Sequence, residues 1–392
     1  MPVRPLFVFG VARSGTNLLA RLLDRHPAVV VALDPLLPLY RALRNTVMAE
    51  TAPEELRRGF SPEQPFQDHY FDDAGPGRLD LFLAAPTELP LQGVAPEALG
   101  AAIGARAALE SPALGEALSR VRGDAYRGLF ERALEIIAAG RPGVRWVGCK
   151  EVWVLDFLPF LARIFPDARF YVLERDPRAI VASLRAMAES DPSQAAHAPS
   201  YLRHWRKQVA LLHHFAGDPA LAGRVRTIGY ESLVGAPEAE ARRLCAELDL
   251  DFDPRMLDVS ADGWRGNSSY ADAAVGVHAQ SVDRWRQILP PGAVATADWL
   301  CGPEMRLTPY RRVAPPDLDA ALAGLMDEDR QPGAWRSDGD LLSGCGGEIL
   351  RLHLADHRDP VDPRLARRCF LFSALLDRIR SPAAPSLEGQ NQ

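Results

Sequence analysis

Lysine is almost missing from this chain. Lys150 and Lys207 are the two lysines, and the other 43 of the 45 basic residues are arginines. Arginine therefore serves at nearly every basic position, so a lysine at a predicted strand end indicates a need for a compact ammonium group. Lys207 lies within a predicted helix and is interpreted as a solvent-exposed residue. The net charge of -6 argues against a general nucleic-acid-binding protein.

Paired cysteines and long apolar runs are also missing. The cysteines are scattered, with neither a C-x-x-C pair nor a Cys/His spacing typical of a metal site, which predicts reduced structural thiols and no bound metal; they are Cys149, Cys245, Cys301, Cys345 and Cys369. No stretch approaches 18 uninterrupted apolar residues, so we expect no membrane span. The first residues do not follow a secretory-signal pattern, and we expect a cytoplasmic protein.

A strand, a glycine loop and a helix follow one another near the start of the chain. Leu6–Phe9 is a short apolar run typical of a buried strand, and apolar residues take helical spacing from Leu18 onward. The loop between them, Gly10–Thr16, would present backbone N–H groups and the positive end of a helix dipole at one place. Arg13 adds a fork of hydrogen-bond donors. The pattern favours an anion-binding loop, with an ordinary tight turn as the alternative.

This loop departs from the pattern G-x-x-x-x-G-K-[ST] of nucleoside-triphosphate enzymes. Gly10 and Gly15 have the expected spacing, but Thr16 and Asn17 stand where the lysine and the Mg²⁺-binding hydroxyl are required. The loop is thus predicted to bind a phosphate-like anion without Mg-ATP.

Further strands and helices alternate along the chain. This alternation predicts an α/β fold of the P-loop-like, three-layer kind, with a central parallel sheet of about five strands; the strands are expected at Leu6–Phe9, Val29–Leu33, Arg145–Cys149, Arg169–Glu174 and Arg224–Gly229. Ligands bind such sheets at the carboxyl ends of the strands. Just past those ends lie Arg13, Asp34, Lys150, Arg175 and Tyr230.

We expect one main domain over residues 1–312 and an extension over 313–392. A helical insertion occupies about residues 50–140, with helices at Pro96–Leu109 and Ala125–Ala139. Asp156 is expected to cap a helix over Phe157–Phe165. The extension is expected to hold one helix, Pro363–Ile379, and a disordered tail of about a dozen residues.

Five short motifs resemble the sulfotransferases that use 3′-phosphoadenosine 5′-phosphosulfate (PAPS), and among them the tyrosylprotein-sulfotransferase-like branch. The loop from Arg13 to Leu19 resembles the 5′-phosphosulfate loop, and the segment from Arg175 to Ser183 resembles the 3′-phosphate signature. The other three are Leu23-Asp-Arg-His-Pro27, Cys149-Lys-Glu followed by Arg163-Ile-Phe-Pro166, and Tyr230-Glu-Ser-Leu-Val234. The resemblance covers roughly residues 5–40 and 145–312.

The resemblance implies roles for individual residues. Those that would wrap the 5′-phosphosulfate are Arg13, Ser14, Gly15, Thr16, Asn17 and Leu18. Arg175 and Ser183 would take the 3′-phosphate, and Tyr230 would lie against the cofactor. A late segment would bring Ser268 or Ser269 and Arg284 near the transferred group.

The resemblance gives three catalytic candidates, Arg13, Asp34 and Lys150, with His26 as a rival to Asp34. Asp34 stands where the branch has a glutamate as general base, and a carboxylate there can take the proton of an acceptor hydroxyl. His26 is the rival base, with a structural role at a helix end as its other interpretation. Lys150 and Arg13 would stabilise the charge on the leaving oxygen. Sulfate carries less charge than phosphate, so we expect no metal requirement.

The predicted function is transfer of a sulfuryl group from PAPS to a hydroxyl or amine of a small molecule, glycan or peptide. The alternatives are a P-loop kinase or other nucleotide-triphosphate enzyme, and a non-catalytic nucleotide-binding module. Secretory members pair the cysteine beside the lysine with another cysteine. Here Val31 is expected opposite Cys149, so we expect no such disulfide. The insertion, expected to be an acceptor lid, and the extension differ from the family, so the acceptor does not carry over.

Overall fold

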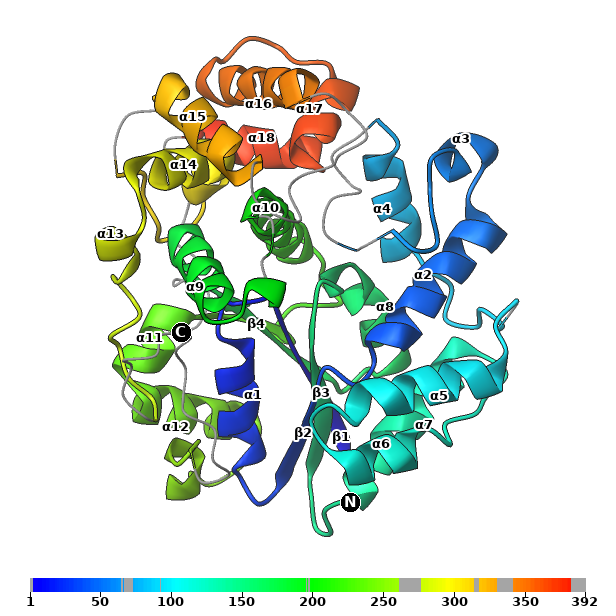
Figure 1. Cartoon of the computed structure of the whole chain (residues 1–392). Helices are drawn as coiled ribbons and strands as arrows, with labels where there is room; N and C mark the ends of the chain where they lie inside the picture. The colour runs from blue at the N-terminus through cyan, green and yellow to red at the C-terminus, as the bar shows by residue number, and fades with distance from the viewer. Residues whose placement is uncertain are drawn as a thin grey trace.

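A five-stranded parallel sheet forms the centre of the molecule (Figure 1). The computed structural model describes residues 3–64, 66, 73–91, 93–194, 196, 198–260, 276–313, 317–329 and 341–381. The strands lie in the order β2-β3-β1-β4-β5. Their bounds are β1 Arg4–Gly10, β2 Val29–Leu33, β3 Trp146–Val152, β4 Arg169–Glu174 and β5 Val225–Gly229. The predicted fold class and all five predicted strands are confirmed.

The strands are buried on both faces, as their near-continuous apolar sequences predict. In β1, Leu6 and Val8 pack on one side of the sheet, and Phe7 and Phe9 pack on the other. Helices that cover the first side are α1 Thr16–Asp24, α11 Tyr230–Gly235 and α12 Pro237–Glu247. Helices that pack on the second side include α7 Tyr126–Ala139, α8 Leu158–Ile164 and α10 Ala198–Phe215.

Two details of β3 differ from the sequence prediction. The strand continues through Val152, so Lys150 lies within it, paired with Leu33, and not just past its end. Cys149 is paired with Ala32 and not with Val31. The residue opposite the cysteine is still not a cysteine, and Cys149 is a free, buried thiol.

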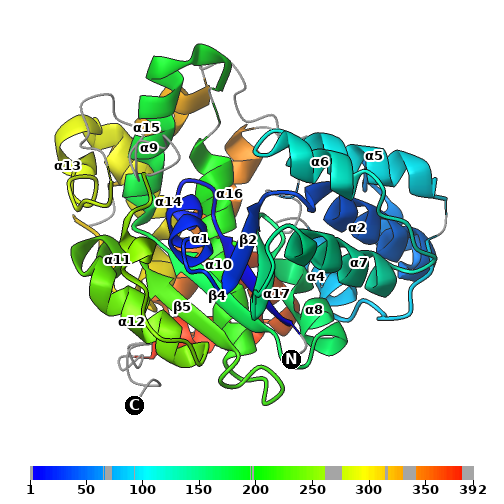
Figure 2. The ribbon, with the colours of Figure 1, turned by 90° about the horizontal axis from the view of Figure 1, so that it is seen from below.

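Helices fill the long connection between β2 and β3 and form a lobe beside the sheet (Figures 1 and 2). They are α2 Leu37–Thr51, α3 Glu54–Arg57, α4 Gly75–Leu83, α5 Pro96–Ala107, α6 Pro112–Leu118 and α7. The two predicted helices correspond to α5 and α7. The sequence analysis did not predict α2, in which Arg44 is buried and donates to the carbonyls of Gln64 and Pro62.

The region after β5 is more helical than predicted. It contains α13 Trp285–Ile288, α14 Pro291–Met305, α15 Leu318–Asp329, α16 Leu341–Asp356, α17 Pro363–Phe370 and α18 Ser373–Arg380. The prediction of one helix over Pro363–Ile379 is wrong, because Leu371 has a φ of 65° and breaks it in two. From residue 382 onward, the predicted tail lies outside the residues that the structure describes. Within the described ranges, no helix is long and apolar enough to cross a bilayer.

A buried ion-pair network joins three of these helices. Arg206 of α10 pairs with Glu348 of α16 at 2.7 Å, and Arg351 of α16 pairs with Glu304 of α14 at 2.7 Å. Arg351 also contacts Glu348 at 2.9 Å. Each charge in this network faces an opposite charge, as buried ions require.

Candidate active site

The loop between β1 and α1 is shaped by two left-handed residues. Arg13 has a φ of 72° and Gly15 a φ of 98°. A Cβ on Gly15 would lie 2.4 Å from the ring of Tyr230, and a Cβ on Gly10 would lie 2.6 Å from the Thr16 side chain. Only glycine fits at these two positions, and the close packing brings the loop against the aromatic ring of Tyr230.

Unused hydrogen-bond donors gather where this loop enters α1. Gly15 is the N-cap of α1 and has no side chain with which to cap the helix, whose first N–H groups have no partner within the helix. The hydroxyl of Ser14 is fully buried and meets no hydrogen-bond partner within the described residues. An anion at this position would satisfy both, so the loop fits a phosphosulfate group.

The second predicted motif contacts the first. Arg175 follows β4 directly, and its Nη1 donates to the carbonyl of Arg13 at 2.9 Å. Arg13 in turn donates from Nε to the hydroxyl of Ser183 at 3.2 Å. Ser183 lies in α9 Pro177–Ser190, which Asp176 caps through the N–H of Arg178. Segments about 160 residues apart in the sequence therefore form one site.

Arg175 is buried, and one of its three nitrogens has no hydrogen-bond partner among the described residues. Its guanidinium lies 4.0 Å from the centre of the Tyr230 ring, and its Nη2 donates to the carbonyl of Ser281 at 3.2 Å. The Nε of Arg175 is buried, and no described residue accepts its hydrogen bond. The Tyr230 hydroxyl is hydrogen-bonded to Ser281 at 2.6 Å. Arg175 is thus held by three contacts while Nε remains able to bind an anion.

Asp34 and Lys150 form an ion pair at the edge of the site. Lys150 Nζ contacts Asp34 Oδ2, and the Asp34 N–H donates to the Lys150 carbonyl at 2.8 Å. The Lys150 side chain is 3% exposed and that of Asp34 is 19% exposed. Asp34 Oδ1 is buried and has no hydrogen-bond partner in the described part of the chain. One carboxylate oxygen is therefore paired, and the other is left to accept a proton.

Glu151 is a second carboxyl beside this pair, and the sequence did not single it out. It is fully buried and accepts a hydrogen bond from the Leu36 N–H. Burial raises the pKa of Glu151 well above its ordinary value, and the charge of Asp34 raises it further. Burial and the neighbouring Asp34 therefore both favour the protonated form of the Glu151 carboxyl.

His26 is held in a structural position. Its Nδ1 accepts a hydrogen bond from the Ala28 N–H at 3.1 Å, and its Nε2 lies 2.9 Å from the Asp251 carbonyl. With Nδ1 accepting, Nε2 carries the proton and donates. Both ring nitrogens are thus engaged with backbone groups at the C-terminal end of α1.

The remaining predicted site residues lie in different surroundings. Thr16 and Asn17 begin α1, whereas the Leu18 side chain is in the core and its N–H donates to Gly15. Arg284 is the N-cap of α13, whose Trp285 lies under the Arg178 guanidinium at 4.2 Å. Ser268 and Ser269 lie outside the described residues.

Two sequence predictions are wrong, one for Lys207 and one for Asp156. Lys207 is not exposed, because its Nζ pairs with Asp156 at 2.8 Å and both side chains are 0% exposed. Asp156 lies in a 3-10 turn, Leu155–Phe157, and does not cap α8. Helical periodicity alone could not distinguish this buried charge from a surface one.

Contacts between residues distant in the sequence support the site. Glu231 accepts from the Asp176 N–H at 3.1 Å and from the Tyr310 hydroxyl at 2.7 Å. Trp205 donates from its indole to the Arg175 carbonyl at 2.9 Å. These contacts fix the backbone on both sides of Arg175, and only the folded chain reveals them.

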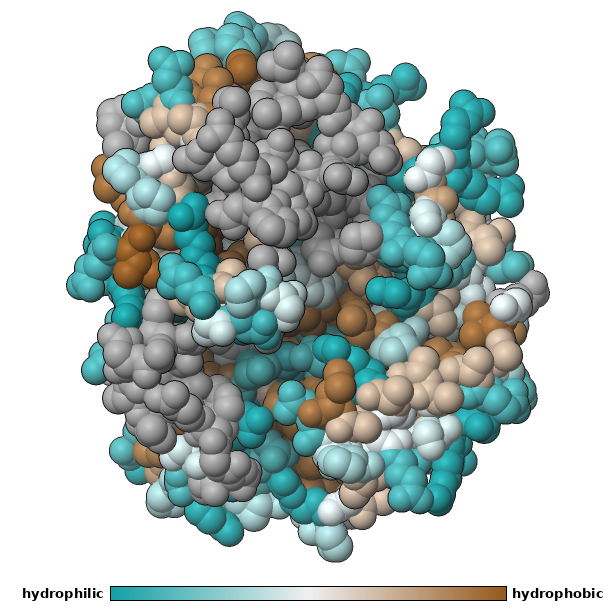
Figure 3. Space-filling view, viewed as in Figure 1, coloured by the Kyte–Doolittle hydropathy of each residue, from teal (hydrophilic) through white to brown (hydrophobic). Residues whose placement is uncertain are grey.

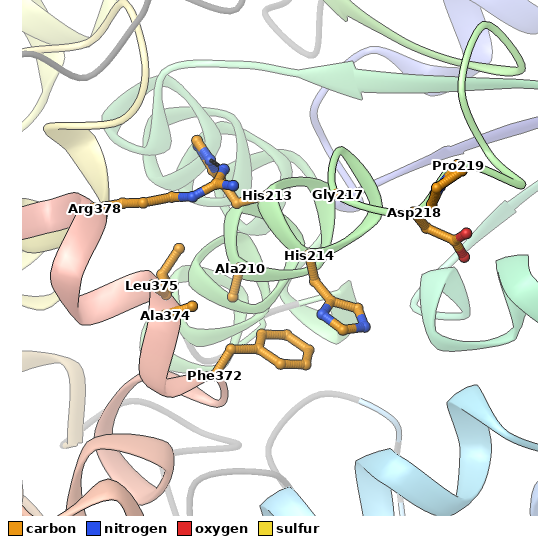
Figure 4. A pocket seen from close by; sticks show the side chains of 10 residues that line it. All are labelled: Ala210, His213, His214, Gly217, Asp218, Pro219, Phe372, Ala374, Leu375 and Arg378. Atoms are coloured by element: carbon orange, nitrogen blue, oxygen red, sulfur yellow. Dashed lines mark hydrogen bonds between the residues drawn. The ribbon is translucent and has the colours of Figure 1, made fainter.

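A pocket of about 500 Å³ lies elsewhere, at the C-terminal end of α10 (Figure 4). His214 stacks on Phe372 with ring centres 4.2 Å apart, and Arg378 contacts His213. None of the predicted site residues lines it.

On the face shown in Figure 3, polar and apolar residues meet in a hollow between the lobe of helices that connects β2 to β3 and the rest of the molecule. Among the described residues, no group of three or more His, Cys, Asp or Glu side chains could hold a metal ion.

Comparison with known proteins identifies a family. The model of the sulfotransferase family matches residues 5–254. A Caenorhabditis briggsae protein named "Putative protein-tyrosine sulfotransferase" is 25% identical over 111 residues, which are 28% of this chain and 38% of that protein. The matched part thus spans well under half of that relative.

Solved structures give more distant matches. The sulfotransferase domain of the Synechococcus PCC 7002 olefin synthase is 18% identical, with a TM-score of 0.40, over 84% of this chain and 96% of that one. Sulfotransferase STF1 of Mycobacterium tuberculosis H37Rv is 16% identical, with a TM-score of 0.35, over 74% of this chain and 78% of that one.

Proposed function

Because this chain belongs to the sulfotransferase family, we propose that it transfers a sulfuryl group from PAPS to a hydroxyl or amine of an acceptor. PAPS supplies an activated sulfuryl group. The bond from the acceptor oxygen or nitrogen to sulfur forms as the bond from sulfur to the 5′-phosphate oxygen breaks, and the acceptor proton passes to a base. Positioning and charge stabilisation account for most of the rate in such a transfer.

One observation carries this proposal. Arg175 donates to the Arg13 carbonyl, and Arg13 donates to Ser183, so the 5′-phosphosulfate loop and the 3′-phosphate signature interlock. The two features together suit an adenosine carrying phosphates at both its 3′ and 5′ positions. In this assignment Tyr230 lies against the cofactor, and the 5′-phosphosulfate meets residues 13–18, with Leu18 contributing only backbone.

Asp34 is the proposed general base and Lys150 the proposed stabiliser of the leaving oxygen. The free, buried Oδ1 of Asp34 suits proton acceptance, whereas both nitrogens of His26 are occupied by backbone groups. Lys150 is a compact cation on β3, the strand next to β1, which leads into the anion loop. Arg13 assists from the loop itself. Arg284 and, outside the described residues, Ser268 or Ser269 are assigned to the cofactor from the family resemblance alone.

The proposal includes no metal, because Thr16 and Asn17 replace the lysine and hydroxyl that Mg²⁺-dependent nucleotide enzymes require. A kinase is for the same reason not favoured. We assign the helices between β2 and β3 to the acceptor lid and the protein to the cytoplasm. The acceptor class stays open among small molecules, glycans and peptides.

Calorimetric titration with adenosine 3′,5′-bisphosphate tests the proposal without an acceptor. We expect this ligand to bind far more tightly than AMP or ATP, with no Mg²⁺ present. Arg175→Ala should weaken binding by about 2–4 kcal/mol, because a charge-assisted phosphate contact is lost. Arg120→Ala, which removes an exposed arginine on the lobe, is the matched control. Equal affinity for AMP, or an unaffected Arg175→Ala variant, would refute the proposal.

A further inference from the structure

One arginine of the inserted lobe reaches the proposed base. Arg106, in the last turn of α5, donates from Nε to the Asp34 carbonyl at 3.2 Å. Its Nη2 lies 3.9 Å from Asp34 Oδ2, the oxygen that Lys150 also contacts. The Arg106 side chain is 37% exposed, so this contact lies at the mouth of the site and not in the core.

The backbone of Asp34 needs support of this kind. Asp34 has a φ of 47°, which is uncommon for a residue with a side chain, and Pro35 follows it. Such conformations persist where the surroundings fix them, and they gather at functional sites. The Asp34 N–H is bonded to Lys150 of β3, and the Asp34 carbonyl is bonded to Arg106 of α5. Two different elements therefore hold the one residue.

The position of α5 is itself well determined. A Cβ on Gly104 of α5 would lie 2.7 Å from the Gly115 carbonyl, and a Cβ on Gly115 of α6 would lie 2.7 Å from the Gly104 carbonyl. The two helices are therefore packed backbone to backbone. Beyond α5, Glu110 pairs with Arg21 of α1 at 3.6 Å. Arg106 is thus carried on a closely packed helix pair, and an ion pair just beyond α5 links it to the helix of the anion loop.

Two positively charged side chains lie beside the single carboxylate of Asp34. Lys150 and Arg106 are both cations close to Asp34 Oδ2, and burial raises the pKa of the neighbouring Glu151 carboxyl, which favours its uncharged form. Two cations compete for one carboxylate oxygen. Removing Arg106 would leave the oxygen to Lys150 alone and release the Asp34 carbonyl.

We propose that Arg106 is a positioning residue for Asp34, so that the inserted helices complete the catalytic centre as well as covering it. This inference rests on the proposed function for the role of Asp34, but the contact network can be measured without any turnover. Arg106 acts through Asp34 and is not assigned a contact with the transferred group.

Because the chain has two lysines, isotope labelling of lysine can test the contact between Arg106 and Asp34. A chain grown with [ε-¹⁵N]lysine has two lysine side-chain signals, and Lys150→Arg assigns them by removing one. We expect Arg106→Ala to shift the Lys150 signal and to leave the Lys207 signal unchanged. Arg106→Lys keeps the charge but not the guanidinium fork, so its shift should be smaller. Arg120→Ala should shift neither signal.

Two further measurements separate the possible outcomes. Adenosine 3′,5′-bisphosphate should bind Arg106→Ala as it binds the parent protein, because Arg106 does not contact the proposed phosphate sites. Sulfuryl transfer should fall about tenfold, with partial recovery in Arg106→Lys, since misplacement of a catalytic group slows the reaction.

An unchanged Lys150 signal in Arg106→Ala would overturn the inference even if the nucleotide binds. Absence of nucleotide binding by the parent protein would instead refute the proposed function, while the lysine signals would still report on the contact. If the alanine variant does not fold, Arg106→Gln, which retains a side-chain donor, replaces it with the same criteria.

Discussion

The two lysines of the chain lie in two differently built regions, although each pairs with an aspartate. Lys207 and Asp156 are 2.8 Å apart with both side chains 0% exposed, between α10 and the turn before α8. Lys150 and Asp34 meet at the carboxyl end of the sheet, where Asp34 is 19% exposed and its Oδ1 has no partner among the described residues. The first pair is closed, and the second retains an unused oxygen.

The same contrast extends to the neighbouring groups. Around the site, the Ser14 hydroxyl and the Arg175 Nε are buried without a described partner. In the helical region, Arg206, Arg351, Glu304 and Glu348 pair with one another. Buried polar atoms cost free energy unless something satisfies them. The difference supports our proposal that the first region binds a ligand, whereas the charges of the second region stabilise the fold.

Asp34→Asn should have the largest effect on activity. A positioned base contributes roughly 10²–10⁴-fold, so turnover should fall by about that factor while affinity for adenosine 3′,5′-bisphosphate stays nearly unchanged. The measurement is transfer of labelled sulfate to an acceptor identified by screening. Unchanged turnover would move the base role to another residue, with His26 as the first to test.

Asp156→Asn applies the same substitution to the closed pair and should act on stability alone. Breaking a buried ion pair by removing one partner costs about 3–5 kcal/mol, because the other charge is left uncompensated. Denaturant unfolding should show this loss, and the protein that remains folded should bind adenosine 3′,5′-bisphosphate normally. A loss of nucleotide affinity without a loss of stability would contradict the division between the two regions.

Arginine substitutions at Lys150 and Lys207 should have different effects in the two regions. At Lys150 a guanidinium would be wider and planar, and a displacement of about 1 Å can cost on the order of 10²-fold in rate. At Lys207 no space is available for the larger group, so we expect about 1–3 kcal/mol of destabilisation and little change in rate per folded molecule. The two variants should therefore fail in different assays, turnover for one and unfolding for the other.

A pH dependence of stability is also expected from Glu174, the last residue of β4. Burial, and next the charge of Glu231, raise the pKa of Glu174 to about 8. The folded protein keeps this proton while the unfolded chain loses it above its ordinary pKa near 4.5. Raising the pH between these values therefore favours unfolding, by about 1.4 kcal/mol per pH unit from this group.

Glu174→Gln should remove that part of the slope when the free energy of unfolding is measured between pH 5 and about 8. Glu348 offers the opposite case, because Arg206 and Arg351 outweigh its burial and lower its pKa to about 2. The stability that Glu348 contributes is present above its ordinary pKa and is lost as the pH falls toward 2. A Glu174→Gln variant with the parent slope would contradict the assignment.

Local sequence predicted the fold well, and it placed several candidate site residues at one edge of the sheet. Each strand is a short apolar run next to a turn, and the residues after such runs lie at one edge of the sheet. There Arg175 contacts Arg13 and Tyr230, and Asp34 pairs with Lys150 of β3. These features depend on a few consecutive residues and on the geometry of parallel sheets.

Contacts between distant segments could not be predicted. Lys207 has the helical spacing of many surface lysines, and only its pairing with Asp156 across about 50 residues makes it a core residue. Arg106 and Tyr310 lie in segments whose composition carries no catalytic pattern, yet each bonds to a residue of the site or its support.

The central position of β1 has a consequence for how the protein is made. Both neighbours of this strand, β3 and β4, follow it in the chain by more than 130 residues. At 5–20 residues per second, the ribosome needs about ten to thirty seconds to pass from β1 to the end of β4. Until β3 is made, the apolar run Leu6–Phe9 has neither strand to pair with, while the helices between β2 and β3 are already emerging. The nascent chain therefore depends on these helices, or on a chaperone, to shield its first strand from other unfinished chains.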